Sequence, residues 1–329
     1  MGRSLGKLVL TALGITFLIM RIVFPPHYGY SFVKRFQEPL RSNIPDLSRF
    51  KGSNAVNPEF RILICVMSPF WASWRRQIVR NAYRRFPQHL PVDVVFVEGN
   101  LALPNKNADR IKTMQHTVIE WENSTYNDIL HLDCDENMNK GKTYEFLKKV
   151  GRELGHKYTH LLKTDDDAFI NIPGISPFDS SDGTALVEVI REHQHEKHLY
   201  WGTSYRDVSE VTWGRVGTGN RTELWGSGYV MSWDVVEWIA TSDIPPQNLH
   251  GLPEDWEVFA WLMEGGLDDN YVLNRTAFSE YPHPEFAYKE YELWNDVHPF
   301  DRWIIVTHPL KYDWMFVETA EYYLGLDWK

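Results

Sequence analysis

The sequence predicts an α/β protein built on a mostly parallel sheet with helices on both faces. Between residues 61 and 163, short apolar runs alternate with longer amphipathic segments, which is the order of strands and helices in such sheets. The apolar runs hardly alternate with polar residues, so both faces of their strands are expected to be buried. The chain has 329 residues, of which 43% are hydrophobic and 24% charged. This composition favours a large globular core and excludes a mainly disordered, collagen-like or coiled-coil protein.

The individual elements follow from these patterns. Strands are predicted at residues 61–68, 92–97, 128–132 and 158–163 and, late in the chain, at 303–307. Helices are predicted at residues 73–86, 107–122 and 142–154, with Ser73 as a candidate cap, and a further helix is expected to open at Pro253. Because ligands of open α/β sheets bind beyond the carboxyl ends of the strands, the residues that follow each strand are the first candidates for a site.

Charge and cysteine content exclude several kinds of protein. The 34 Lys and Arg residues against 44 Asp and Glu residues give a formal net charge of −10, so no nucleic-acid partner is expected. The two cysteines, Cys65 and Cys134, both lie in apolar runs, which excludes a disulfide framework and a cysteine-rich zinc site. The 14 tryptophans offer flat faces that suit sugar rings, although an aromatic-rich core explains them equally well.

The fourth predicted strand runs directly into three consecutive carboxylates, Asp165, Asp166 and Asp167. Adjacent carboxylates repel one another and need a cation or a set of donors at a strand end. Since successive side chains of an extended segment point to opposite sides, Asp165 and Asp167 can face one site while Asp166 faces away. Oxygen ligands suit Mn²⁺ or Mg²⁺. A solvated acidic turn is the alternative, but the position after a buried strand favours a metal site.

Two arginines, Arg75 and Arg76, lie in the first turn of the helix predicted after the first strand. Cations there oppose the helix dipole, so their presence indicates a role beyond helix stability. Arg76 and Arg80 are four residues apart and share a face. A helix start that bears arginines would suit a diphosphate nucleotide, and a solvated basic face is the alternative.

Several segments resemble one known family in the same order along the chain. The run YTHLLKTDDDAFIN resembles the LKTDDDVFVN signature of the β-1,3-galactosyltransferase and N-acetylglucosaminyltransferase family, to which the Fringe enzymes are related. Four further runs resemble other motifs of that family: RILICVMSPFWASWRRQIVRNAYR, NDILHLDCDENMNKGKTYEFLKKV, LWGSGYVMSWDVV and LPEDWEVFAWL. The resemblance extends from Arg61 to His308, and NMNKGKTYEFL is closer to the fungal branch than to animal members.

The resemblance implies a Rossmann-like fold of GT-A type and a single catalytic domain. It also implies a UDP-sugar donor, a divalent cation that is usually Mn²⁺, and inversion at the anomeric carbon. A hexose, with galactose favoured, would pass to a glycan or glycoprotein acceptor, with a β-1,3 linkage expected, in protein glycosylation or cell-wall glycan synthesis. UDP-N-acetylglucosamine and UDP-galactofuranose remain alternative donors. A catalytically inactive carbohydrate-binding protein and a metal-dependent hydrolase remain alternative functions.

Roles for individual residues carry over from the family by position. Asp165, Asp167 and His308 would hold the metal, and Asp255 would be the general base, with Glu254 as the second choice. The donor would be bound by Arg76, Arg80, Lys163 and Asp166. The donor and acceptor pocket would be lined by Trp225, Gly226, Ser227, Gly228 and Glu254. Gly226 stands where the family usually has a cysteine, so one disulfide of the family is not expected here.

The N-terminal region predicts a membrane anchor. Residues 1–7 would form a cytosolic tail, residues 8–24 an uncleaved signal anchor that ends before two prolines, residues 25–58 a stem and residues 59–329 the lumenal domain. A cleaved signal peptide is the alternative. With the resemblance, this predicts a single-pass type II protein of the Golgi membrane. Three N-glycosylation sequons begin at Asn123, Asn220 and Asn274.

Overall fold

The computed structural model describes eleven stretches of the chain, which all lie within one compact unit formed by residues 44–329. They are residues 60–87, 89–101, 108–137, 139–155, 157–172, 186–203, 223–247, 252–267, 270–273, 278–280 and 304–324. The predicted tail, anchor and stem lie outside these residues. Within the described stretches, no helix combines the length and the apolar character needed to span a membrane.

A seven-stranded sheet forms the centre of the unit. Its strands follow the order β3-β2-β1-β4-β7-β6-β8. Their bounds are Ile62–Met67 (β1), Val92–Asn100 (β2), Ile129–Asp135 (β3), His160–Asp165 (β4), Leu199–Gly202 (β6), Gly228–Ser232 (β7) and Asn270–Leu273 (β8). Only β7 runs against the others, since it pairs antiparallel with both β4 and β6. The predicted mostly parallel, Rossmann-like sheet is thus confirmed.

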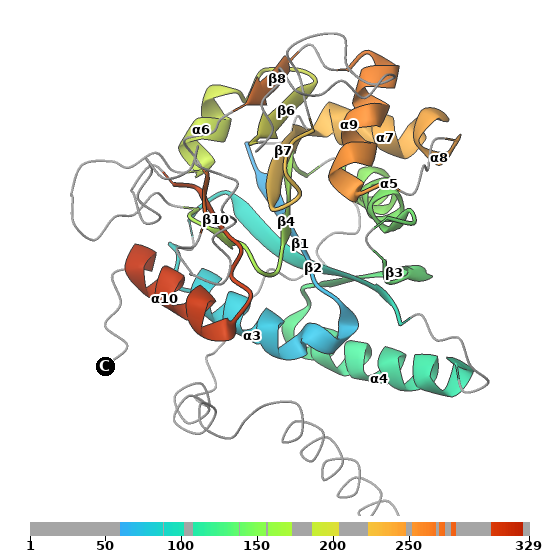
Figure 1. Ribbon diagram of the computed structural model, residues 1–329, viewed down its shortest axis with the longest axis vertical. Helices are drawn as coiled ribbons and strands as arrows, with labels where there is room; N and C mark the ends of the chain where they lie inside the picture. The colour runs from blue at the N-terminus through green and yellow to red at the C-terminus, as the bar shows by residue number, and fades with distance from the viewer. Residues whose placement is uncertain are drawn as a thin grey trace, which may run out of the picture. The chain divides into compact units, whose positions relative to one another are not determined.

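Helices cover both faces of this sheet, as Figure 1 shows. On one side lie α3, α4 and α10, and on the other lie α5, α7 and α9. The helix bounds are Ser73–Tyr83 (α3), Ala108–Tyr126 (α4), Lys142–Leu154 (α5), Leu186–Glu192 (α6), Trp233–Thr241 (α7), Ile244–Gln247 (α8), Glu254–Gly265 (α9) and Asp313–Leu324 (α10). A short 3-10 turn, η2 (Phe70–Ala72), leads into α3, so Ser73 is the first helical residue rather than the predicted cap.

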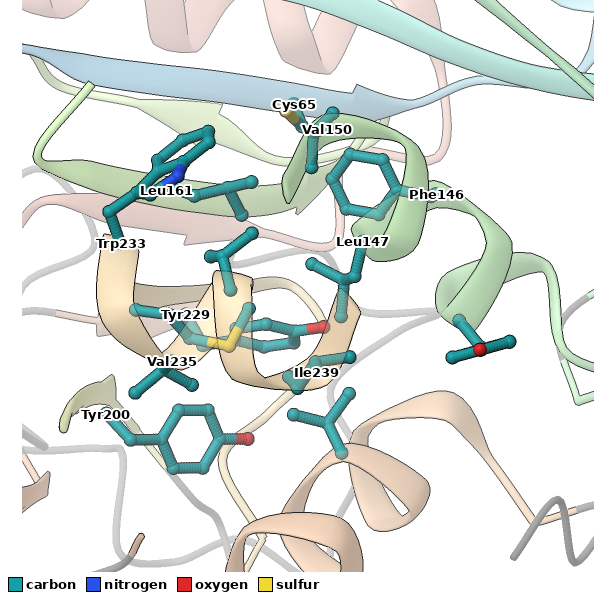
Figure 2. Close-up of a cluster of buried hydrophobic side chains, with 14 of the residues drawn as sticks. Cys65, Phe146, Leu147, Val150, Leu161, Tyr200, Tyr229, Trp233, Val235 and Ile239 are labelled. Atoms are coloured by element: carbon teal, nitrogen blue, oxygen red, sulfur yellow. The ribbon is translucent and has the colours of Figure 1, made fainter. Parts of the chain in front are cut away.

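The main hydrophobic core lies between the sheet and the helices α5, α7 and α9. Cys65 of β1 and Leu161 of β4 point from the sheet toward Leu147 of α5, and all three side chains are buried (Figure 2). The two helices α5 and α7 come close together because Gly151 has no side chain: a Cβ there would lie 2.7 Å from the Cβ of Ala240. The same core packs α7 and α9 together with β4 and β7.

A second, three-stranded sheet was not expected from the sequence. It consists of β5 (Phe169–Ile170), β10 (Val306–His308) and β9 (Phe278–Glu280), in the order β5-β10-β9. The predicted late strand at 303–307 overlaps β10 only at Val306 and Thr307, because β10 begins at Val306 and ends at His308. Because β5 begins just after the aspartate triplet, its antiparallel pairing with β10 brings β10 to the end of β4.

Candidate functional site

The aspartate triplet lies at the carboxyl end of β4. Asp165 is the last residue of the strand, and Asp166 and Asp167 form the turn toward β5. Asp166 is directed to Ser68, the residue after β1, whose hydroxyl donates a hydrogen bond of 2.9 Å to its Oδ2. Burial raises the pKa of Asp166 to about 6, and the Ser68 hydrogen bond only partly offsets that effect. The structure thus separates Asp166 from the other two carboxylates.

Asp165 and Asp167 meet His308 in a group that could hold a metal ion. One ligand atom from each of the three residues lies within 4.8 Å of the others. Nε2 of His308 is 3.5 Å from Oδ1 of Asp167. The convergence follows from the second sheet, in which Thr307 pairs with Phe169, and from the backbone N–H of Leu310, which donates to the Asp167 carbonyl at 2.7 Å.

Lys311 also reaches this group, which sequence reasoning missed. Its ammonium donates to Oδ2 of Asp167, and its side chain is 53% exposed. Burial by itself would raise the pKa of Asp167, but His308 and Lys311 outweigh it and hold that pKa well below its usual range. No pattern around Lys311 marks it in the sequence, since its position depends on the long-range pairing of β10.

Arg75 secures the segment that carries His308 and Lys311. Its guanidinium donates to the Leu310 carbonyl and, at 3.0 Å, to Oδ1 of Asp313 at the start of α10. The same guanidinium lies 5.4 Å from the ring centre of Phe316. An arginine in the first turn of α3 therefore has a partner on α10, which explains its unfavourable place relative to the helix dipole.

Lys163, predicted to bind the donor, is buried with three acceptors around its ammonium. Its side chain is 2% exposed. Its Nζ donates to Oδ1 of Asp165 at 2.9 Å, to the Gly226 carbonyl at 2.7 Å and to Oε1 of Glu254. Burial would lower the pKa of Lys163, but the two carboxylates outweigh it and raise that pKa above its usual value.

The two acidic residues that open α9 have different surroundings. Glu254 accepts a hydrogen bond from Lys163 through Oε1. Its Oε2 also accepts hydrogen bonds from the hydroxyls of Tyr229 at 3.0 Å and Thr143 at 3.4 Å. Asp255 accepts from the backbone N–H of Gly226 at 3.3 Å and from that of Trp256 at 3.0 Å.

Burial raises the pKa of both Glu254 and Asp255, and the positive charge of Lys163 opposes the increase in each.

The segment from Trp225 to Gly228 lies beside the triplet because β7 is antiparallel to β4. Gly228 pairs with Thr164 at the end of β4, and the Thr164 hydroxyl donates to the Ser227 carbonyl at 2.7 Å. Trp225 packs edge to face against His308, with 5.4 Å between ring centres. All four predicted pocket residues of this segment therefore adjoin the metal-binding group or its strand.

Arg76 and Arg80, also predicted to bind the donor, are paired inside the protein. Arg76 donates to both oxygens of Glu122 at 2.9 and 2.6 Å. Arg80 donates to both oxygens of Asp128 at 2.7 and 2.8 Å, and its Nη1 lies 2.8 Å from Oε1 of Glu122. Both arginine side chains are buried, so the carboxylates of α4 and of the segment before β3 balance their charge. A role in donor binding stays a prediction.

One sequon can be placed in the structure. Asn123 lies in the last turns of α4, and its Oδ1 accepts a hydrogen bond of 3.0 Å from the backbone N–H of Ile129. The other two sequon asparagines, Asn220 and Asn274, lie outside the described residues.

The chain is similar to known glycosyltransferases. No protein-family model matches it. It is 26% identical over 161 residues to UDP-GalNAc:beta-1,3-N-acetylgalactosaminyltransferase 2 of Xenopus tropicalis, which covers 45% of this chain and 29% of that protein. It is 24% identical over 174 residues to the Homo sapiens protein of the same name, with 48% and 31% covered. The matched part thus spans less than a third of the length of these relatives.

Solved glycosyltransferases are similar at low identity. The galactosyltransferase LgtC, in complex with donor and acceptor sugar analogues, has a TM-score of 0.40 and 12% identity, covering 81% of this chain and 98% of LgtC. The glycosyltransferase GlyE of Streptococcus pneumoniae has a TM-score of 0.42 and 10% identity, with 82% and 61% covered.

Proposed function

We propose that the chain is a metal-dependent, inverting glycosyltransferase that moves a hexose from a UDP-sugar to an acceptor hydroxyl in β-1,3 linkage. One observation carries the proposal. Asp165, Asp167 and His308 gather at the carboxyl end of β4, and Asp255 joins the same edge through the Gly226 backbone. Ligands of open α/β sheets bind at this edge.

The three gathered side chains fit a divalent cation. Two carboxylates and one imidazole form a donor set suited to Mn²⁺. Such a cation would supply the Lewis-acid charge that stabilises a departing UDP. Asp165, Asp167 and His308 would hold the ion, and Lys311 would move from Asp167 when the ion binds. Manganese is our proposal among the divalent cations, as the family resemblance implies.

Asp255 is the better candidate for the general base. Glu254 is held by one ammonium and two hydroxyls, so a proton from an acceptor would have to displace one of these partners. Asp255 accepts hydrogen bonds from two backbone N–H groups, which leaves lone pairs of its oxygens for an acceptor hydroxyl. Burial, which raises the pKa of Asp255, strengthens it as a base while it remains ionised.

The donor we propose has the galacto configuration. The sequence resemblance favours galactose, and the curated relatives are named for transfer of N-acetylgalactosamine from its UDP conjugate. These two sugars share the configuration of the C4 hydroxyl. We further propose, on the sequence alone, a glycan or glycoprotein acceptor and a Golgi-lumenal domain held by an anchor at residues 8–24.

The test is a panel of UDP-sugars with mixed glycan acceptors, Mn²⁺ and the full chain in detergent, read by mass spectrometry. Asp255→Asn should retain UDP binding and lose turnover by about 1,000-fold, as loss of a general base predicts. Asp234→Asn is a matched control, because Asp234 also opens a helix but contacts Ser232 at the far end of β7. If Asp255→Asn keeps its activity, the general base is another residue. Donor hydrolysis that no acceptor accelerates would indicate a hydrolase, and UDP binding without turnover an inactive binding protein.

A further inference from the structure

We infer that Lys163 is a positioning residue that sets Asp255 at a fixed place relative to the Asp165–Asp167–His308 group. This inference rests on the proposed function, and it replaces the direct contact between Lys163 and the donor that the sequence predicts. Three observations support it: the surroundings of the ammonium, the two-sided bonding of Gly226, and the space that Gly226 leaves free.

The surroundings of the Lys163 ammonium leave it no spare donor. An ammonium has three hydrogens, and the structure gives it three acceptors, on Asp165, Gly226 and Glu254. These acceptors belong to β4, to the turn before β7 and to the start of α9. Since the side chain is 2% exposed, binding a phosphate would require breaking one of these bonds in a buried place. Lys163 therefore acts through the residues that it holds.

Gly226 connects Lys163 to Asp255. Its carbonyl accepts from Lys163 at 2.7 Å, while its N–H donates to Oδ2 of Asp255 at 3.3 Å. On the opposite side, Lys163 donates to Asp165 at 2.9 Å. A continuous chain of hydrogen bonds thus runs from a metal-binding carboxylate to the proposed base. A second connection passes through Glu254, the residue before Asp255 on the same helix.

The third observation is the small space at Gly226. A Cβ on this residue would lie 2.8 Å from Oε1 of Glu254, 3.4 Å from Nζ of Lys163 and 3.7 Å from Oδ2 of Asp255. The nearest of these atoms, Oε1 of Glu254, cannot rotate away freely, because it accepts a hydrogen bond from Lys163. A glycine here lets the lysine, the glutamate and the aspartate approach the same backbone atoms. A methyl group would displace them without removing any charge.

The experiment compares four variants with the wild-type full chain in detergent. They are Lys163→Met, Gly226→Ala, Asp255→Asn and the double variant Lys163→Met/Asp255→Asn. Mn²⁺ binding and UDP binding in saturating Mn²⁺ are measured by calorimetry, and kcat and KM by product formation. Calorimetric stoichiometry gives the folded fraction of each sample, so that kcat is expressed per folded molecule.

We expect Lys163→Met and Gly226→Ala to lower kcat by about 100-fold, as a small misplacement of a catalytic group does. KM for the donor and the Kd of UDP should stay within about threefold of wild type, because the contacts that bind the ground state and the transition state equally are unchanged. The double variant should be no slower than Asp255→Asn alone. Arg61→Met is a matched control for stability: Arg61 pairs with buried Asp93 at the opposite edge of the sheet, at 2.6 Å, so this change should leave kcat unaltered.

Two results would overturn the inference. UDP affinity lost in Lys163→Met, with multiplicative effects in the double variant, would make Lys163 a direct donor ligand. Unchanged kcat in both Lys163→Met and Gly226→Ala would remove any positioning role. Failure of the proposed function is distinguishable, since the wild-type chain itself would then neither bind UDP with Mn²⁺ nor transfer a sugar.

Discussion

Replacement of Arg76 by methionine decides between a structural and a donor-binding role for this arginine. The Arg76 side chain is fully buried. Its guanidinium donates to Glu122 at 2.9 and 2.6 Å and to the Pro69 carbonyl at 2.8 Å. A second buried carboxylate, Glu98, lies 3.9 Å away. Arg76→Met would therefore remove the cation between two buried anions.

The expected loss of stability follows from this arrangement. Removing one partner of a buried ion pair costs about 3–5 kcal/mol. Because Arg80 still lies 2.8 Å from Glu122, we expect the lower end, about 3 kcal/mol. For a unit of this size, that loss lowers Tm by roughly 6–12 °C.

The assay is urea unfolding of the full chain in detergent, followed by tryptophan fluorescence, together with calorimetry of UDP binding. The double variant Arg76→Met/Glu122→Leu removes both partners and should recover part of the stability, since an apolar pair replaces a lone buried charge. The reasoning is refuted if the free energy of unfolding of Arg76→Met lies within about 1 kcal/mol of the wild-type value, because an exposed ion pair contributes no more than that. A selective loss of UDP affinity in that variant would support the donor-binding role that the sequence predicts.

Two further predictions concern Lys311 and His160. Lys311→Met should strengthen Mn²⁺ binding about fourfold, since the half-exposed ammonium beside Asp167 no longer competes with the ion. Calorimetry measures the Mn²⁺ affinity, and weaker Mn²⁺ binding would contradict the assigned contact. Burial lowers the pKa of His160 to about 4, below the value of about 6.5 in an unfolded chain. Above about pH 6.5 the ring is neutral in both the folded and the unfolded chain, so its burial costs no proton. As the pH falls from about 6.5 toward 4, the unfolded chain takes up a proton at His160 before the folded chain does, and the free energy of unfolding of the wild type should fall by about 2–3 kcal/mol. His160→Gln should not show this loss. Urea unfolding of both chains at pH 7 and pH 4.5 checks this, and equal losses would contradict it.

The fold could be predicted from local patterns because most of its strands and helices carry their own hydrophobic pattern in the sequence. The helix predicted at 142–154 is α5 within the same bounds, and the first four predicted strands all occur. Alternation along an extended segment also anticipated that Asp165 and Asp167 face one site while Asp166 does not. These inferences need only the geometry of single elements.

The remaining parts of the site depend on contacts that no local pattern contains. The role of His308 could be predicted only from the family resemblance, because its position depends on the pairing of β10 with a two-residue strand. Arg76 and Arg80 looked like free cations, since their partners lie 46 and 48 residues further along the chain. Lys311 carried no signal at all, because its contact with Asp167 spans 144 residues.

The central claim is that Asp165, Asp167 and His308 hold a divalent cation that in turn binds the diphosphate of a nucleotide sugar. Calorimetric titration of UDP into the wild-type full chain and into Asp167→Ala, each with and without Mn²⁺, tests it most directly. We expect UDP to bind the wild type only when Mn²⁺ is present, and Asp167→Ala to bind UDP in neither condition. Equal UDP affinity with and without the ion, or an Asp167→Ala variant that keeps its Mn²⁺-dependent binding, would contradict the account.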